Sequence, residues 1–324
     1  MGPGYGTGRR SGFAILTALA AWLSLVAAVE AAPLSQAITA LVPFATAPFP
    51  FDGIVPETGQ PFLDVIAGGR RGHRSARGGV YWADETYADN RSLLFVPAGF
   101  DPRRPATIVV YFHGNESTLS RDVLGRQRVA DQLARSGLNA VLLAPQFAFD
   151  AFDSSPGRFW LRGAFAAYLG EASDAFAGLL GEAALAGVFD RMPVVLVAYS
   201  GGYLAAARVA TIGGAGPRLC GLVLFDAAYA EAPAFASWIF GRRGDGFFFS
   251  AYTASTEAGN IELQRLLSER GMPYGRGLAV RLLPGAVTFV GVGVEHRDFV
   301  TTAWRPDPLR WLLSEVAANG DCQW

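Results

Sequence analysis

Hydrophobic residues from Arg91 onward fall into short uninterrupted runs, and longer stretches with helical spacing separate these runs. Each run has the length of a strand, is rich in β-branched or aromatic residues, and is bounded by Gly, Pro or polar positions. The predicted strands are Ser92–Val96, Thr107–Phe112, Asn139–Ala144, Val194–Ala198, Leu219–Phe225, Phe247–Tyr252 and Ala286–Val292. The predicted helices are Arg121–Arg135, Gly163–Leu180, Gly202–Ala210, Ile261–Arg270 and Leu309–Ala318. This alternation predicts an α/β fold with a mostly parallel central sheet and helices on both faces.

The first thirty residues have a different pattern. Arg9 and Arg10 precede an uncharged apolar run from Phe13 to Val29, and small residues follow it. This order is typical of a secretory signal peptide, and a retained N-terminal membrane anchor also fits it. We therefore expect residues 1–31 to be a signal peptide or anchor and residues 32–324 to form a single domain. The location expected is extracytoplasmic, either periplasmic or secreted, with membrane contact only through the N-terminal segment.

Residues 33–80 are rich in Pro, Gly and Ala and contain no clear periodic pattern. The Arg- and Gly-rich stretch from Gly68 to Gly79 is typical of an exposed loop. His73 lies within it, so we expect this histidine to be solvated and without a role.

The composition excludes several classes of function. The 324 residues include 27 basic and 28 acidic residues, and every basic residue is Arg. Without Lys there is no Schiff-base chemistry, no P-loop and no Ser-Lys dyad. The near-neutral net charge and the absence of basic runs provide no basic surface for a phosphate backbone, so nucleic-acid binding is not expected. Three His and two Cys at wide spacing do not form a metal-binding pattern, so no structural metal is expected. Cys220 and Cys322 either pair in an oxidising compartment or remain thiols.

Ser200 is the candidate nucleophile. The strand that ends near Ala198 runs into Ser200-Gly201-Gly202 and then into a helix. Small residues stand two positions before and two positions after the serine, because a sharp strand-turn-helix elbow leaves no room for larger ones there. The pattern is G-x-S-x-G with Ala198 in place of the first glycine. A plain turn between strand and helix would give a similar sequence.

Two further segments complete a pattern that resembles the α/β-hydrolases. His113-Gly114-Asn115 follows the predicted strand Thr107–Phe112, and His296 follows the last predicted strand. A His-Gly loop, a serine elbow and a late histidine occur in that order in this superfamily. The region from Arg91 to Ala318 is therefore similar to a serine esterase or lipase of the secreted kind.

The resemblance implies a sheet of about eight strands, no cofactor, and acyl transfer to water. It also implies an oxyanion hole formed by the main-chain N–H groups of Asn115 and Gly201, in a loop that includes His113 and Gly114. His113 precedes the serine in the chain, so we interpret it as a structural residue of that loop. Among the three histidines, this leaves His296 as the general base.

The acid has more than one candidate. Asp226 ends the strand next to that of the nucleophile, and a carboxylate at the end of an apolar strand needs a partner such as a histidine N–H. Glu257 follows the next strand, where most members of the fold carry the acid. Glu295 and Asp298 are less favoured because they adjoin His296 in sequence. We predict Asp226, with Glu257 as the alternative.

The predicted function is hydrolysis of a carboxylic ester on a small-molecule or acyl substrate by a Ser-His-Asp triad. A peptidase or amidase with the same triad, or a binding protein without activity, are the alternatives. Several residues are candidates for substrate contacts. The aromatic candidates are Phe147, Phe149, Phe152, Phe159, Trp160, Tyr229, Trp238 and Phe240. The polar candidates are Asp153, Ser154 and Ser155, with Arg158, Arg162, Arg242 and Arg243 for an anion.

Overall fold

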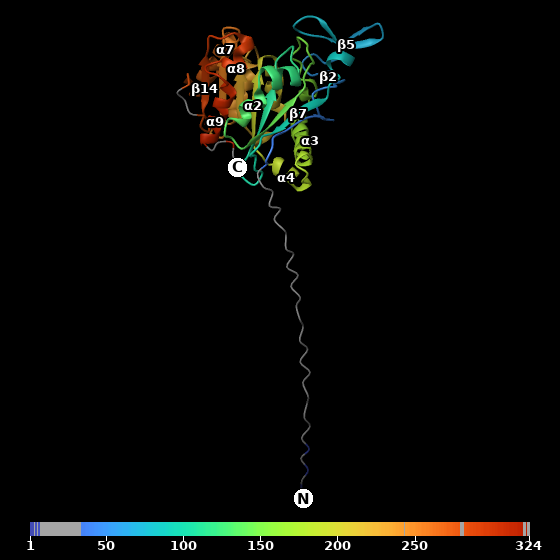
Figure 1. Cartoon of the computed structure of the whole chain (residues 1–324), viewed down its shortest axis with the longest axis vertical. Helices are drawn as coiled ribbons and strands as arrows, with labels where there is room; N and C mark the ends of the chain where they lie inside the picture. The colour runs from blue at the N-terminus through green and yellow to red at the C-terminus, as the bar shows by residue number, and fades with distance from the viewer. Residues whose placement is uncertain are drawn as a thin grey trace. The chain divides into compact units, whose positions relative to one another are not determined.

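The computed structural model of the protein describes residues 34–319 apart from 243 and 279–281, together with Cys322 and residues 1, 2, 4 and 6. Residues Ala32–Trp324 form one compact unit (Figure 1). The predicted signal peptide or anchor lies outside the described residues, apart from those four positions. None of the helices in the described part of the chain is long and apolar enough to cross a membrane.

The fold is built on one large mixed sheet, whose strand order is β1-β7-β9-β8-β10-β11-β12-β14-β13. In that order the strands are Ile38–Pro43, Arg91–Val96, Ala140–Pro145, Thr107–Phe112, Val194–Tyr199, Leu219–Phe225, Phe247–Tyr252, Val287–Gly291 and Gly275–Arg276. The β1–β7 and β7–β9 pairs are antiparallel, and all other pairs are parallel. The predicted sheet is confirmed, and the seven predicted strands end within one residue of the observed limits. The sheet has nine strands because β1 and the short β13 extend it beyond the predicted set.

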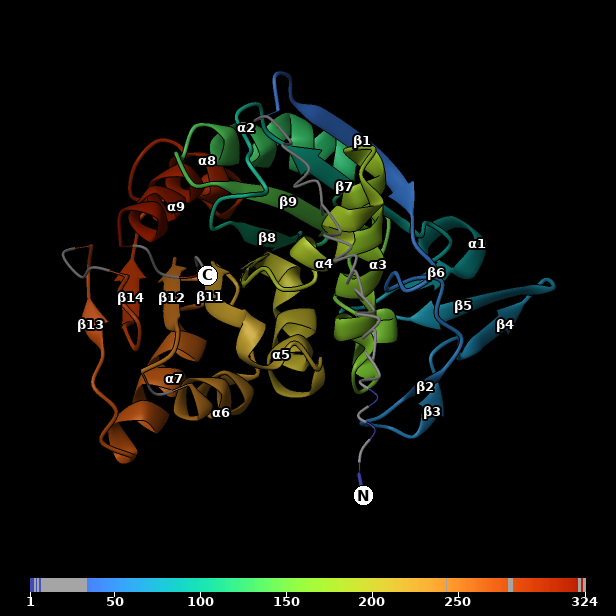
Figure 2. The same ribbon diagram turned by 90° about the horizontal axis from the view of Figure 1, so that it is seen from below.

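Helices cover both faces of this sheet (Figure 2). On one face lie α3 (Ala164–Leu179), α4 (Ala186–Phe189), α5 (Tyr203–Ile212), α6 (Ala232–Gly241) and α7 (Glu257–Glu269). On the other lie α2 (Val129–Ala134), α8 (Phe299–Thr302) and α9 (Pro308–Asn319). Since neither face meets water, the central strands are apolar at almost every position, and each buried Val, Leu, Ile or Phe side chain contributes about 1.5–3 kcal/mol.

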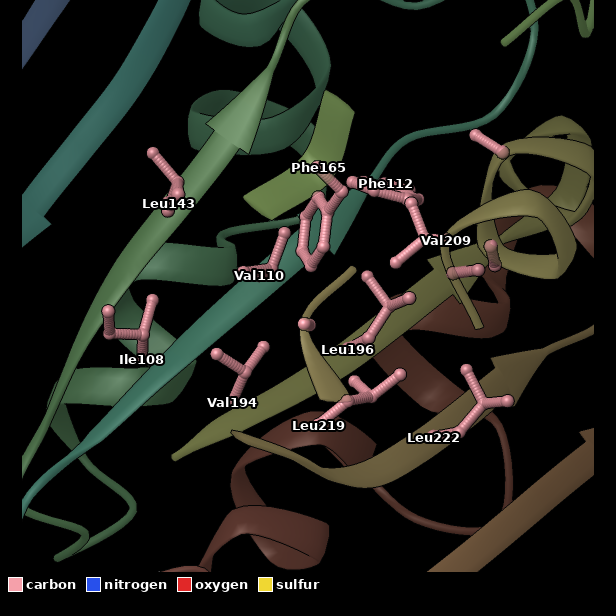
Figure 3. Packing of buried hydrophobic residues seen from close by; sticks show 14 of the residues in the cluster. Ile108, Val110, Phe112, Leu143, Phe165, Val194, Leu196, Val209, Leu219 and Leu222 are labelled. Atoms are coloured by element: carbon pink, nitrogen blue, oxygen red, sulfur yellow. The ribbon is translucent and has the colours of Figure 1, made fainter. Parts of the chain in front are cut away.

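Alternate residues of a strand join opposite cores. Ile108, Val110 and Phe112 of β8 point into the core beneath α3 and α5, with Leu196 of the neighbouring strand and Phe165 of α3 (Figure 3). The intervening residues of β8 pack in the core beneath α2 and α9. Because successive side chains of a strand point to opposite faces of the sheet, one apolar run contributes to both cores.

One predicted helix is divided into two, and the longest of the helices that were not predicted is α6. The expected helix Arg121–Arg135 consists of a π-helix, Leu119–Arg126, and α2. They are separated at Arg128, whose φ of 51° is incompatible with a continuous right-handed helix. Helix α6 was not predicted because its sequence, APAFASWIFG, is apolar almost all round and so shows no amphipathic spacing.

The prediction of an exposed loop at Gly68–Gly79 is wrong for Arg70–Arg74, which form a strand, although most of the stretch is exposed. This stretch belongs to a three-stranded antiparallel sheet of β4 (Val65–Ala67), β5 (Arg70–Arg74) and β6 (Val80–Trp82), which we call the accessory sheet. Gly68 and Gly69 form the two-residue turn between β4 and β5, with φ values of 56° and 77°. Such turns require positive φ at both positions, and so the two glycines mark a hairpin.

A small aromatic core attaches the accessory sheet to the rest of the molecule. It contains Phe49, Phe51, Phe62, Tyr87, Ala148, Ala151 and Trp160. His73 of β5 stacks on Phe62, with ring centroids 4.2 Å apart, and its Nδ1 lies 2.7 Å from the Phe62 carbonyl oxygen. The expectation of a solvated His73 is therefore also wrong. A two-stranded sheet, β2 (Ile54–Val55) with β3 (Gln60–Pro61), and the short α1 (Ala83–Thr86) lie in the same part of the molecule (Figure 2).

Cys220 and Cys322 form a disulfide. It joins the start of β11 to the end of the chain and closes a loop with a sequence separation of 102 residues. On the chain-entropy model a loop of this length stabilises the fold by about 4–5 kcal/mol. The sequence allowed either a disulfide or two free thiols, and the structure contains the disulfide.

Candidate active site

Ser200 lies at a tight turn between β10 and α5. Its φ of 51° is unfavourable for a residue with a side chain and is held by the strand before it and the helix after it. Gly202 is required because a Cβ there would lie 2.7 Å from the carbonyl oxygen of Phe112. Gly114 is required because a Cβ there would lie 2.8 Å from the Cβ of Ser200. The space around the elbow is therefore limited by the end of β8 and the loop after it, whereas the sequence pattern predicted that positions 198 and 202 limit each other.

The fold brings together three residues that lie far apart in the sequence. His296 Nε2 is 2.8 Å from Ser200 Oγ, and His296 Nδ1 is 2.6 Å from Asp226 Oδ2. Ser200 and Asp226 directly follow the parallel neighbours β10 and β11, so both stand at the carboxyl edge of the sheet. His296 reaches the same edge from the turn after β14.

Asp226 is fully buried, and its carboxylate accepts several hydrogen bonds besides that of His296. The donors are the Thr253 N–H at 2.9 Å and the hydroxyls of Thr253, Ser255 and Thr256. Burial alone would raise the pKa of Asp226, but the hydrogen bonds from His296, Thr253 and Thr256 outweigh it and lower this pKa to about 2. Asp226 is therefore ionised at neutral pH and fixes the orientation of the His296 ring.

Among the described residues, none of the alternative acids forms a hydrogen bond or ion pair with the His296 ring. Glu257 is exposed at the first residue of α7, and Glu295 and Asp298 are exposed beside the histidine. Both nitrogens of the His296 ring are already engaged by Asp226 and Ser200.

Two tyrosines pack on His296: Tyr199, which the sequence reasoning missed, and Tyr229, which it named only as a candidate for substrate contacts. The Tyr199 ring stacks on the imidazole with centroids 5.1 Å apart, and its hydroxyl donates to the His296 carbonyl oxygen at 2.8 Å. The Tyr229 ring meets the imidazole edge-on, with centroids 6.2 Å apart. Tyr199 occupies the position before the nucleophile, and this was the one sequence signal that could have pointed to it.

His113 is buried and holds the neighbouring loop. Its Nε2 accepts from the Phe147 N–H at 2.9 Å, so Nδ1 carries the proton and donates to the Gly114 carbonyl oxygen at 2.7 Å. Burial lowers the pKa of His113 to about 4, and the bond to Gly114 opposes this shift only partly. The ring is therefore neutral at pH 7. In the described part of the chain the nitrogens of the His113 ring bond to Gly114, Gln146 and Phe147, and neither bonds to Ser200.

The C=O and N–H groups of a trans peptide point in opposite directions. Because His113 holds the carbonyl of Gly114, the N–H of Asn115 is turned away from the His113 ring. The Asn115 side chain lies over Gly201, where a Cβ would clash with Asn115 Oδ1. Ser154 donates a hydrogen bond to the same oxygen at 3.0 Å. Asn115 and Gly201 thus lie against each other beside Ser200.

A cavity of about 410 Å³ opens onto Ser200 and His296. Arg121, Arg126 and Arg297 contribute to its lining, together with Glu116, Asp122 and Phe152. Asp122 pairs with both Arg121 and Arg126, at 2.9 Å and 3.0 Å. Arg121 also pairs with Asp150 at 2.8 Å. Arg297 has no ion-pair partner among the described residues, and Glu116 supplies one opposing charge.

Most of the residues proposed for substrate contacts lie elsewhere. Of the aromatic candidates, Phe152 lines this cavity and Tyr229 touches His296, while Phe147 and Phe159 are buried in the core. Arg158 donates to the carbonyl oxygens of Ala47 and Pro50. Arg162, Arg242 and Trp238 line a cavity of about 680 Å³ that contains none of the candidate site residues. Arg243 lies outside the described residues.

Among the described residues no group of three or more His, Cys, Asp or Glu side chains is arranged to hold a metal ion.

No protein-family model matches the sequence, and no curated protein matches it. Solved structures with a similar architecture include the feruloyl esterase module from Clostridium thermocellum, with 12% identity and a TM-score of 0.45 over 90% of this chain and 96% of that one. An S-formylglutathione hydrolase from Agrobacterium tumefaciens has 15% identity and a TM-score of 0.42, over 78% and 97%. The Staphylococcus aureus fluorophosphonate-binding serine hydrolase F has 10% identity and a TM-score of 0.42, over 86% and 99%. This likeness concerns architecture and assigns no substrate to this chain.

Proposed function

We propose that this protein is a serine hydrolase that cleaves a carboxylic ester with Ser200, His296 and Asp226. The observation that supports it most directly is the pair of hydrogen bonds, 2.8 Å and 2.6 Å long, that links a serine at a strained elbow through a histidine to a buried carboxylate. A serine hydroxyl is a poor nucleophile unless a base removes its proton, and this arrangement supplies the base and fixes its orientation.

In the proposed reaction His296 Nε2 takes the proton of Ser200 while Oγ forms a bond to the carbonyl carbon of the ester. The carbonyl oxygen becomes an oxyanion. When the tetrahedral intermediate collapses, the ester C–O bond breaks, and His296 gives the proton to the leaving alcohol. Water then attacks the acyl-enzyme by the same route and releases the acid. Asp226 stabilises the imidazolium form of His296 throughout.

The proposed oxyanion hole consists of the main-chain N–H groups of Asn115 and Gly201. Gly201 lies in the first turn of a helix, where N–H groups have no partner within the helix. His113 fixes the peptide that carries the Asn115 N–H. Losing one such donor costs about 2.7–4 kcal/mol of transition-state stabilisation in other acyl-transfer enzymes, so the position of this loop matters for the rate.

A fluorophosphonate probe tests the proposal. It should label the wild-type protein, and peptide mapping should locate the adduct on Ser200. The Ser200→Ala variant should show no labelling and no hydrolysis, while its thermal unfolding stays within a few degrees of wild type. If the wild type resists the probe, or if Ser200→Ala keeps its activity, the proposal is wrong. Short p-nitrophenyl esters assayed beside peptide p-nitroanilides distinguish an esterase from a peptidase or amidase.

We propose further that the protein acts outside the cytoplasm, after cleavage behind Ala31. The signal-peptide order of residues 1–31 and the Cys220–Cys322 disulfide both support this location. Cell fractionation with N-terminal sequencing of the mature protein tests it. A mature chain that begins at Ala32 in the extracytoplasmic fraction is expected, and a full-length chain in the cytosol would contradict it.

A further inference from the structure

Arg77 lies in the turn between β5 and β6 of the accessory sheet, and its side chain is exposed. Its guanidinium carbon is 5.2 Å from the centre of the Phe152 ring and 5.1 Å from the centre of the Tyr229 ring. No carboxylate of the described residues pairs with this guanidinium, whereas Arg70 and Arg71 of the same sheet are both paired. Ring contacts hold the cation in place without supplying a counter-charge.

The two aromatic rings place Arg77 next to the proposed triad. Phe152 lines the cavity that contains Ser200 and His296, and Tyr229 packs edge-on against His296. Arg77 itself lines a second cavity, of about 340 Å³, together with Ser154 and Tyr203. Because Ser154 bonds to Asn115, this second cavity begins beside the proposed oxyanion hole.

The turn that carries Arg77 is fixed by hydroxyl groups. Ser75 Oγ accepts from the Arg77 N–H at 3.2 Å and lies 3.0 Å from the Phe152 carbonyl oxygen and 3.2 Å from Asp153 Oδ1. Asp153 is buried and also accepts from Tyr87 and Ser155, both at 3.0 Å. The base of the turn is thereby held in place before any ligand binds, and this lowers the entropic cost of recognition.

The charges around the site leave Arg77 available. Arg121 and Arg126 are neutralised by Asp122 and Asp150, whereas Arg297 at the first cavity, like Arg77, has no ion-pair partner among the described residues. Arg77 differs from Arg297 in that two aromatic rings hold its guanidinium in place. The second cavity contains two carboxylates, but Asp153 is enclosed by hydroxyls, and Asp64 accepts from the Arg74 main-chain N–H. An unpaired guanidinium beside a reaction centre is suited to bind a carboxylate with two parallel N–H donors.

We propose that Arg77 is a specificity-determining residue that binds an anionic group, a carboxylate in the first instance, on the ester substrate. This inference rests on the proposed function of Ser200, His296 and Asp226, and it names the class of ester that the site prefers. The accessory sheet then supplies the recognition of charge, while the edge of the main sheet supplies the chemistry.

The test compares three esters with the same reporter. One is neutral p-nitrophenyl butyrate, one is the mono-p-nitrophenyl ester of glutaric acid, with the carboxylate on the acyl side, and one is a butyrate whose nitrophenyl group carries a carboxylate. Wild-type protein should prefer at least one anionic ester over the neutral one. Arg77→Gln should lower kcat/KM for that ester by about 10- to 100-fold, mainly through a higher KM. It should change kcat/KM for the neutral ester by less than about 3-fold. Arg77→Lys should retain part of the preference.

Arg70→Gln is the matched control, because it removes the same charge from the same sheet at a position paired with Asp84 and Glu85. It should leave the preference unchanged. If Arg77→Gln lowers kcat/KM equally for all three esters, or leaves the ratio of anionic to neutral kcat/KM as in wild type, Arg77 does not recognise an anion. The proposed hydrolase activity would still stand. If the wild type hydrolyses none of the esters and Ser200 is not labelled by the fluorophosphonate, the proposed function itself fails.

Discussion

The carboxyl edge of the main sheet and the accessory sheet both border the candidate site, but different interactions build them. At the sheet edge, each important residue follows a buried parallel strand directly or by a few positions, as Ser200 follows β10 and Asp226 follows β11. In the accessory sheet, Arg77 is positioned by ring contacts and hydroxyl bonds to residues that lie 75 or more positions away, such as Phe152 and Tyr229. Under the proposed function, residues at the carboxyl edge of the main sheet carry out the reaction, and Arg77 of the accessory sheet selects the substrate.

The largest effect should follow from Asp226→Asn. The amide retains the shape of the side chain but cannot hold the same tautomer of His296, so kcat for a p-nitrophenyl ester should fall by about 10⁴-fold. Glu257→Gln, at the alternative acid, should change kcat by less than about 2-fold. Steady-state kinetics on both variants checks this. A large loss in Glu257→Gln with activity retained in Asp226→Asn would move the acid to Glu257.

The next largest effect should follow from Gly114→Ala. A Cβ at this position would lie 2.8 Å from Ser200 Cβ and 3.2 Å from its Oγ, so the nucleophile or the loop must move. We expect kcat to fall by about 10²-fold and the free energy of unfolding by about 1–3 kcal/mol. Gly170→Ala is the control, since a Cβ there in α3 would meet no atom within 4 Å beyond its own stretch of helix, and alanine should stabilise by about 0.5–1 kcal/mol. Unimpaired kinetics in Gly114→Ala would show that the loop tolerates displacement.

The same contrast explains what the sequence could predict. Buried parallel strands have continuous apolar runs and sharp polar boundaries, so β8, β11 and β12 are predicted to the residue. The carboxyl ends of parallel strands lie at the same edge of a sheet, so the residues that follow these strands come close together. For this reason Ser200, Asp226 and the loop at His113 could be named in advance.

The accessory sheet could not be predicted in this way. Its strands are three to five residues long, and β5 reads RRGHR, without apolar alternation, because its partners are Phe62 and other residues of a small aromatic core. Asp153, Tyr87 and Ser75 meet only in three dimensions, and no local pattern joins them. The sequence likewise left open whether Asp226 or Glu257 lies next to His296, and the hydrogen bond between His296 and Asp226 forms only in the folded chain.

A smaller effect, on stability, should follow from His113→Gln at acid pH. Burial depresses the pKa of His113 to about 4 in the folded state, against about 6.5 when unfolded. Its contribution to stability is complete above pH 6.5 and is lost as the pH falls toward 4, because the unfolded chain binds the proton first. Wild type should lose about 2 kcal/mol from this group between pH 7 and pH 4.5, and the variant should not. Urea unfolding at the two pH values measures it. Asp226, with its pKa of about 2, contributes only to losses below about pH 4.

The smallest effect should follow from Tyr87→Phe, and it tests the division between the two regions most directly. The variant keeps the aromatic packing but removes one of the hydroxyls that hold Asp153, so the free energy of unfolding should fall by about 1 kcal/mol. Because Asp153 also holds the turn that carries Arg77, the preference for an anionic ester should weaken a few-fold while kcat for a neutral ester stays the same. Tyr274→Phe, whose hydroxyl contacts Ser268 and Arg276 away from the site, should alter neither. A fall in neutral-ester kcat in Tyr87→Phe would mean that the accessory sheet supports the nucleophile as well, and that recognition and chemistry are not separate in this fold.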